Sequence, residues 1–80
     1  MRWVHFKIPY SATADARKAL EEMGLKTADT GHGGVTVWHG QGRPGAMVKI
    51  SSYNRCTVLV TDDKAQDFAA RCALAERESF

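Results

Sequence analysis

The sequence predicts an α+β fold: a two-layer β-α-β-β-β-α domain whose antiparallel sheet carries both helices on one face. Three observations predict it. Apolar side chains alternate with a period of two in four short segments, as in half-buried strands. They recur at helical spacing in two longer segments, which are therefore amphipathic helices. Short, turn-rich connections separate the later strands, and such connections favour antiparallel pairing.

The first strand and the first helix have the clearest boundaries. Residues 3–8 alternate between apolar and polar side chains, and Pro9 ends the strand. A helix over residues 12–23 follows, with Ser11 as its N-cap. Gly24 stands where the left-handed residue of a Schellman ending belongs, so we expect the chain to turn back there.

Three more strands and a second helix complete the predicted order. The strands span residues 35–39, 46–51 and 55–61, and the first strand must join them to bury its apolar side. The helix spans residues 62–76 and ends in charged residues, where we expect it to fray. The side chains expected in the core are Val4, Phe6, Ile8, Leu20, Met23, Val35, Val37, Val48, Ile50, Val58, Val60 and Phe68.

Length and composition favour a binding function. Eighty residues suit a single domain, 1–80, which buries about 60% of its unfolded surface and has little material for a deep catalytic cleft. The net charge of +2 is too small for the electrostatic footprint of a strong nucleic-acid binder. The apolar runs are too short to cross a bilayer and the N-terminus does not resemble a signal peptide, so we expect a cytoplasmic protein without a membrane partner.

The sequence predicts no metal site, no cofactor and no catalytic residue. No pair of histidines or cysteines has the spacing of a zinc site, and no serine lies in a nucleophile-elbow motif. Cys56 and Cys72 fall on apolar stripes, so we expect buried free thiols. A disulfide between them is the alternative, which a reducing compartment disfavours.

Large side chains are predicted on the uncovered face of the sheet. Two tryptophans beside lysines suit either stacking on single-stranded nucleic acid or anchoring a protein partner. A third interpretation is structural: Trp3 and Trp38 cover each other across strands, or close a homodimer. All three remain open from the sequence. The side chains expected on this face are Trp3, His5, Lys7, Trp38, Met47, Lys49 and Leu59.

Six of the seven glycines lie between Gly31 and Gly45. They do not form a P-loop, because Gly45 leads into a strand rather than a helix. Glycines that allow positive φ in hairpin loops explain them instead. Arg43 stands at the tip of the second glycine loop, where it is placed to contact a carboxylate or phosphate. The candidate binding residues are therefore Trp3, His5, Lys7, Trp38, Arg43 and Lys49.

Residues 16–39 resemble the helix-strand-turn of HicA-type mRNA interferases. The resemblance lies in the helix over 16–24, the Gly31-His32 pair and the Trp38-His39 pair. It implies a double-stranded-RNA-binding-like fold in which His32 is the base that activates a ribose 2′-OH. The chain departs from the family in its first strand and in the two glycines after the histidine. It offers the alternative function: an RNA-binding domain or an RNA-cleaving toxin.

The overall profile is similar to that of the small inhibitors that phages and mobile elements encode, of which anti-CRISPR proteins are the best-known group. Those proteins bind a surveillance complex and block its DNA site or its nuclease recruitment without catalysis. The resemblance implies a non-enzymatic protein that binds a larger host protein or ribonucleoprotein complex stoichiometrically, as a monomer or a homodimer. It is one of profile and shares no motif, so it assigns no role to any residue.

Overall fold

The structure is a computed structural model that describes residues 2–28, 34–50 and 55–78. Its elements follow in the order β1 (Trp3–Ile8), a 3-10 turn η1 (Tyr10–Ala12), α1 (Thr13–Glu22), β2 (Lys26–Ala28), β3 (Val35–Gly40), β4 (Arg43–Ile50), β5 (Cys56–Thr61), α2 (Asp62–Arg71) and β6 (Glu76–Arg77).

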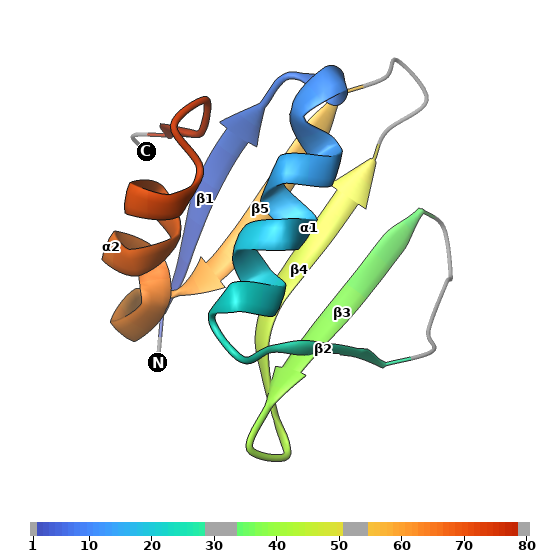
Figure 1. Cartoon of the computed structure of the whole chain (residues 1–80), viewed down its shortest axis with the longest axis vertical. Helices are drawn as coiled ribbons and strands as arrows, with labels where there is room; N and C mark the ends of the chain where they lie inside the picture. The colour runs from blue at the N-terminus through green and yellow to red at the C-terminus, as the bar shows by residue number, and fades with distance from the viewer. Residues whose placement is uncertain (1, 29–33, 51–54, 79–80) are drawn as a thin grey trace.

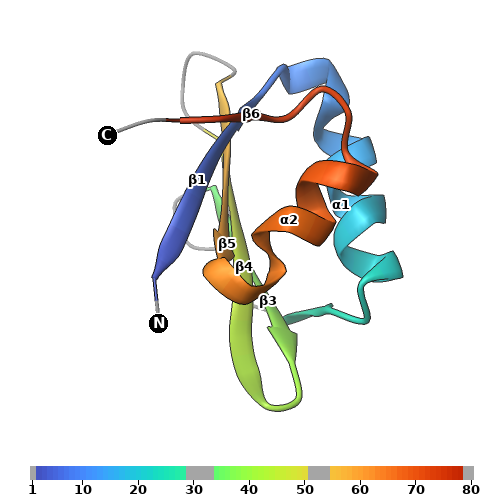
Figure 2. The ribbon, with the colours of Figure 1, turned by 90° about the vertical axis from the view of Figure 1, so that its left-hand side faces the viewer.

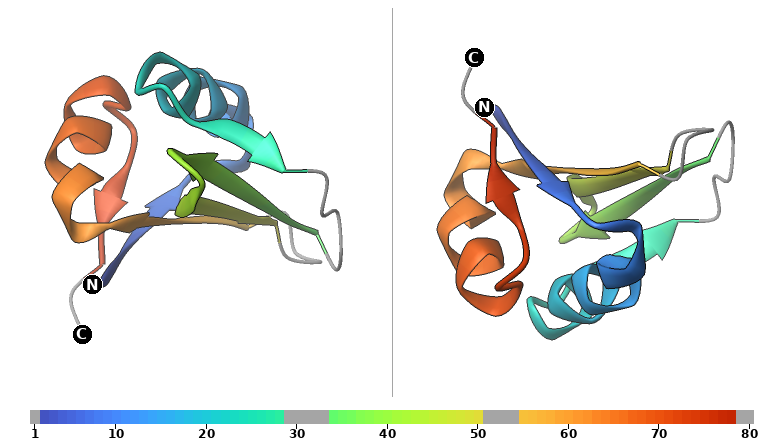
Figure 3. Two further views of the ribbon diagram at one scale, coloured as in Figure 1. Left: turned by 90° about the horizontal axis from the view of Figure 1, so that it is seen from below. Right: turned by 90° about the horizontal axis from the view of Figure 1, so that it is seen from above.

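The strands form one antiparallel sheet in the order β2-β3-β4-β5-β1-β6. Both helices lie on the same side of this sheet, which gives two layers (Figures 1 and 2). Views along the sheet from below and above show the same separation of strands from helices (Figure 3). The predicted α+β class with an antiparallel sheet is confirmed, and two short edge strands, β2 and β6, are added to the predicted order.

Helix α1 ends as its sequence predicts. Gly24 has φ +84°, a conformation that glycine adopts without the steric cost of a Cβ. The Leu25 N–H donates to the Leu20 carbonyl at 3.1 Å and the Gly24 N–H to the Glu21 carbonyl at 3.0 Å, the two bonds of a Schellman motif. This turn buries Leu25 to 2% exposure and starts β2 directly after it.

The start of α1 differs from the prediction. Ser11 is part of the 3-10 turn, and Ala12 holds the N-cap position without a side-chain bond. The Thr13 hydroxyl donates instead to the Tyr10 carbonyl at 2.6 Å. The predicted Ser11 cap is therefore wrong, because a tight turn after Pro9 already provides the first backbone bond, from the Ala12 N–H to the Pro9 carbonyl.

Helix α2 ends at Arg71 rather than continuing to residue 76. Cys72 is 2% exposed and leaves the helical conformation, with φ −121° and ψ 89°. The chain then returns to the outer edge of β1, where the Glu78 N–H donates to the His5 carbonyl at 2.9 Å. The charged segment predicted as a fraying helix end therefore forms β6, because pairing there satisfies backbone groups of β1 that a longer helix would leave open.

The core lies between the helices and the sheet, and it includes most of the predicted residues. Phe6 of β1 meets Phe68 of α2 edge to face, with ring centroids 5.1 Å apart. Val4, Met23 and Ile50 are only partly buried and pack against the core from its margin. The predicted core residues that are fully buried are Phe6, Ile8, Leu20, Val48, Val58, Val60 and Phe68.

Strand β3 faces the other way from the prediction. Trp38 is 2% exposed and belongs to the core, whereas Val35 and Val37 point to the opposite side of the sheet and are half-buried. The reason is a register shift between Trp38 and His39: Gly40 pairs with Arg43, but Trp38 pairs with Ala46, so β4 contributes one extra residue, Gly45. Such a bulge shifts the pattern of inward and outward side chains in one strand by one residue relative to the pattern in its partner.

Two glycines explain the geometry of this hairpin. Gln41 and Gly42 both have positive φ, 55° and 76°, as a two-residue turn of the type I′ class requires. At the bulge, a Cβ on Gly45 would lie 2.9 Å from Leu25 Cδ2, so the missing side chain makes room for Leu25. Of the second glycine cluster, Gly42 lies in the hairpin turn as predicted, whereas Gly40 and Gly45 are part of β3 and β4. Residues 31–33 of the first cluster lie outside the described residues.

Substitution of Phe68 tests the packing of α2. Phe68→Ala should lower the free energy of unfolding by about 3–5 kcal/mol, because it removes a fully buried ring and its contact with Phe6. Phe68→Leu keeps most of the apolar volume and should cost much less. The measurement is urea unfolding followed by circular dichroism, and a loss below about 1 kcal/mol for the alanine variant would contradict the packing.

The two tryptophans should behave differently in solution. Trp38→Ala should cost about 3–5 kcal/mol of unfolding free energy, and Trp3→Ala less than half as much, since Trp3 is only half-buried. Single-tryptophan variants made by Trp→Phe substitution provide a second measurement. Acrylamide should quench the fluorescence of Trp3 strongly and that of Trp38 weakly; equal quenching would show that Trp38 is not in the core.

Candidate functional site

The sheet has one face that α1 and α2 do not cover (Figure 2). Its side chains are the alternate residues of the strands, those that point away from buried positions such as Phe6, Val48 and Val58. We call this surface the open face and define it by Trp3, His5 and Lys7 of β1, Val35 and Val37 of β3, Met47 and Lys49 of β4, and Thr57 and Leu59 of β5.

An apolar row crosses the centre of the open face. Val37 pairs with Met47, Met47 with Leu59, and Leu59 with His5, so four neighbouring strands place one side chain each in a line. All four side chains are half-buried, and each is in part shielded by its neighbours in the row. The row is therefore a continuous apolar strip that ends at an imidazole.

A second row beside it carries the charges. Val35 pairs with Lys49, Lys49 with Thr57, and Thr57 with Lys7, so two lysines stand on either side of a threonine. Both lysines are exposed. Lys7 also pairs with Glu76 of the edge strand β6, which brings a carboxylate to the margin of the face.

The structure brings four of the six predicted binding residues together on the open face: Trp3, His5, Lys7 and Lys49. It places Trp38 on the opposite side of the sheet, inside the core, so the prediction of Trp38 as an exposed binding residue is wrong. The cause is the bulge at Gly45. Arg43 is exposed at the first position of β4, beside the hairpin turn rather than on the face.

Sequence reasoning missed Val35, Val37 and Thr57 as members of this surface. Regular pairing outward from the Gln41–Gly42 turn would align Val37 with Ala46 and so send it to the core. The one available signal was the glycine at position 45, since an isolated glycine inside a strand is a known mark of a bulge.

Two hollows flank β1 where β6 crosses the edge of the sheet. One, of about 450 Å³, is lined by side chains that include Trp3 and His5 together with Arg77 and Glu78. The other, of about 350 Å³, is lined by Lys7, Thr57, Arg55 and again Glu78, among others. Both are open depressions with charges of both signs, so they suit polar contacts at the rim of an interface.

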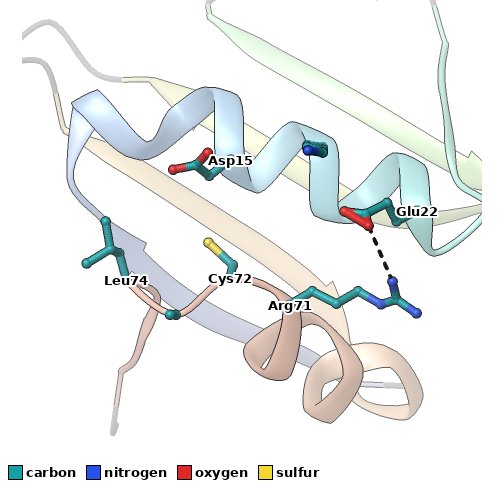
Figure 4. Close-up of a pocket in the computed structure, with 7 residues that line it drawn as sticks. Asp15, Glu22, Arg71, Cys72 and Leu74 are labelled. Atoms are coloured by element: carbon teal, nitrogen blue, oxygen red, sulfur yellow. Dashed lines mark ion pairs between the residues drawn. The ribbon is translucent and has the colours of Figure 1, made fainter.

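A third hollow, of about 320 Å³, lies between α1 and the end of α2 (Figure 4). Arg71 joins the two helices across it: its Nε lies 2.6 Å from Asp67, and Nη1 lies 3.9 Å from Glu22. The Cys72 side chain points toward α1 at the floor of the hollow (Figure 4). Of these exposed ion pairs, Arg71–Asp67 lies within α2 and Arg71–Glu22 connects α2 to α1, and each contributes little stability.

The two thiols are poor nucleophiles. Burial raises the pKa of Cys72, and the backbone amides of Leu74 and Ala75 oppose the shift. Burial likewise raises the pKa of Cys56, against the Thr13 hydroxyl. Because the thiolate is the reactive form, a raised pKa lowers the reactivity of both thiols. Both cysteines are buried and free, as predicted.

Within the described residues, no group of three or more histidine, cysteine or carboxylate side chains is placed to hold a metal ion. His32, to which the resemblance to mRNA interferases assigns the catalytic role, lies outside the described residues. None of the helices described is both long enough and apolar enough to span a membrane.

Comparison with known proteins adds no relative: no family model, no curated protein and no solved structure matches this chain.

The thiols provide a test of burial. At about pH 8, Ellman's reagent should leave Cys56 and Cys72 unmodified in the folded chain and modify both in denaturant. A thiol whose pKa is higher in the folded chain than in the unfolded chain stabilises the fold at pH values below the unfolded pKa of about 8.5. This stabilisation is lost as the pH rises through the pKa of the folded chain. The urea midpoint should therefore fall above about pH 8.5, and by less in a variant with both cysteines changed to alanine. Rapid modification of the folded chain would contradict the burial.

Proposed function

We propose that this domain is a non-enzymatic binding protein that docks a protein partner on its open face and acts by occupying it stoichiometrically. The observation that carries the proposal is the row of Val37, Met47 and Leu59, three partly buried apolar side chains aligned across a sheet face that no described helix covers. Contiguous apolar surface of this kind is characteristic of interfaces.

The composition of the face favours a protein over a nucleic acid. Sheets that read single-stranded nucleic acid stack bases on several aromatic rings. With Trp38 in the core, the rings that the described strands present on this face are the indole of Trp3 and the imidazole of His5. Aliphatic side chains and methionine instead form the adaptable apolar centre of protein interfaces.

The size of the domain is compatible with this role. A standard interface takes about 800 Å² from each partner, which is roughly a seventh of the 5417 Å² of accessible surface here. A single sheet face of four long strands provides a footprint of that order. The opposite face is already used for the core, so binding does not compete with folding.

The partner we propose is a larger nucleic-acid-handling complex in the cytoplasm of a bacterial host, which the domain blocks by binding. What supports this choice is the profile described above: a very small α+β domain with mild charge and an uncovered sheet, similar to the inhibitors of the anti-CRISPR group. Affinity in such a case comes from anchors in the middle of the face, and we assign that role to Met47 and Leu59.

Face and helix variants separate this proposal from a merely structural role for the sheet. Met47→Asp and Leu59→Asp, each placed in the apolar row, should abolish the protection of a CRISPR-targeted phage that the wild-type chain provides, scored as plating efficiency. Ala14→Asp and Ala69→Asp, at exposed positions of α1 and α2, should retain it.

Circular dichroism verifies that all four variants fold, and retention of the host complex by the immobilised chain should follow the same order. The proposal fails if the wild-type chain protects no phage and retains no host complex, or if the helix variants are as defective as the face variants.

A further inference from the structure

The small net charge conceals a separation of charge between the two layers. Helices α1 and α2 carry six carboxylates, Asp15, Glu21, Glu22, Asp62, Asp63 and Asp67, against four cations, Arg17, Lys18, Lys64 and Arg71. The described residues outside these helices carry seven cations, Arg2, Lys7, Lys26, Arg43, Lys49, Arg55 and Arg77, against two carboxylates, Glu76 and Glu78. The helical layer is therefore negative and the sheet layer positive.

The cations of the two layers also differ in their surroundings. In the helical layer, Lys64 pairs with Asp63, and Arg71 pairs with Asp67 and Glu22. On the open face, neither Lys7 nor Lys49 forms an ion pair with another described residue. Both side chains are exposed, so their ammonium groups can meet carboxylates of a partner, although Glu76 is the cross-strand neighbour of Lys7.

The lysines stand at one end of the apolar row. Lys49 follows Met47 by two residues on β4, and Lys7 follows His5 by two residues on β1, so both lie on the same side of the row. Arg55 precedes β5 at this same end and lines a hollow with Lys7 and Thr57. The open face thus has an aliphatic centre and a cationic end.

Two other occupants fit this pattern less well. A second copy docked face to face would bring the Lys7 and Lys49 side chains of both copies into one interface, where like charges repel and must be desolvated. A nucleic acid would find phosphate contacts at the lysines but would set polar sugars and bases against the aliphatic row of Val37, Met47 and Leu59.

We infer that the open face recognises an acidic protein surface with an aliphatic centre, whose carboxylates lie opposite Lys7 and Lys49 and whose apolar side chains lie on the Val37–Met47–Leu59 row. This inference rests on the proposed function and adds the chemistry and the orientation of the partner. In such an interface the apolar row supplies affinity, and the lysines speed association and exclude basic partners.

Two synthetic peptides test the charge preference. Both are amphipathic helices of about 18 residues, or five turns, with leucines on one side; the flanking positions are glutamate in one and lysine in the other. Titrated into the ¹⁵N-labelled full chain, the acidic peptide should shift amide signals of β3, β4 and β5 around Met47 and bind about tenfold more tightly than the basic one.

Variants of the chain then test which side chains cause the preference for the acidic peptide. The double variant Lys7→Gln/Lys49→Gln should reduce the preference for the acidic peptide at least fivefold, since it removes the two cations of the face. The matched variant Lys18→Gln, at an exposed position of α1, should leave it unchanged. Raising the salt concentration from about 50 to about 500 mM should weaken the binding of the acidic peptide more than that of the basic peptide.

Each contrary result has its own meaning. Equal binding of both peptides at the open face overturns the acidic preference while leaving the proposed docking function intact. Shifts confined to the helical layer, or no shifts at all, overturn both. If a single-stranded oligonucleotide of about 16 nucleotides displaces the acidic peptide at about 150 mM salt, the partner of the open face is a nucleic acid and not a protein. If light scattering shows a dimer and Met47→Asp dissociates it, the partner of the open face is a second copy of this chain.

Discussion

The β3–β4 ladder shifts by one residue between Trp38 and His39, and the character of both sheet faces depends on this shift. With Gly45 as the extra residue of β4, Trp38 enters the core beside Ala46, and Val35 and Val37 pass to the open face. Without it, regular pairing from the turn would set Trp38 opposite Gly45 on the open face and send Val37 to the core opposite Ala46. A glycine suits the bulge because Leu25, brought in by the Schellman turn of α1, occupies the space of its missing side chain.

Burial of Trp38 has an energetic cost that its packing must offset. Its indole N–H is buried and has no hydrogen-bond acceptor among the described residues, which costs about 1–3 kcal/mol. The ring covers Ala46, the smallest side chain in the middle of β4, so the large and the small residue fill one layer of the core together. Apolar burial of a side chain this large exceeds the polar cost, and Trp38 consequently serves stability instead of recognition.

The sequence predicted those parts of the fold that depend on local pattern. The alternation in residues 3–8 and the glycine at position 24 determine β1 and the end of α1, and both are found where expected. Strands β2 and β6 have three and two residues, too few for a period of two to show, and their positions depend on the neighbouring strands that they pair with. The side of the sheet on which Trp38 lies was unpredictable for a related reason. One bulged residue exchanges the inward and outward positions of a strand relative to its neighbour, although the pairing is regular on either side of the bulge. Six of the nine residues that define the open face followed from the alternation of β1, β4 and β5, whereas the valines of β3 required the register.

The chain separates its two tasks between the layers. Carboxylates gather on the helices, where Asp62 and Asp63 also suit the positive N-terminus of α2, while the strands and their connections keep most of the cations. The open face therefore presents the cations Lys7 and Lys49, whereas carboxylates outnumber cations on the two helices. In the interface that we propose, the lysines orient the partner before contact and the aliphatic row then binds it. Because the lysines stand beside the apolar row at one end of the face, a carboxylate that meets them sets the direction in which the partner lies along the strands.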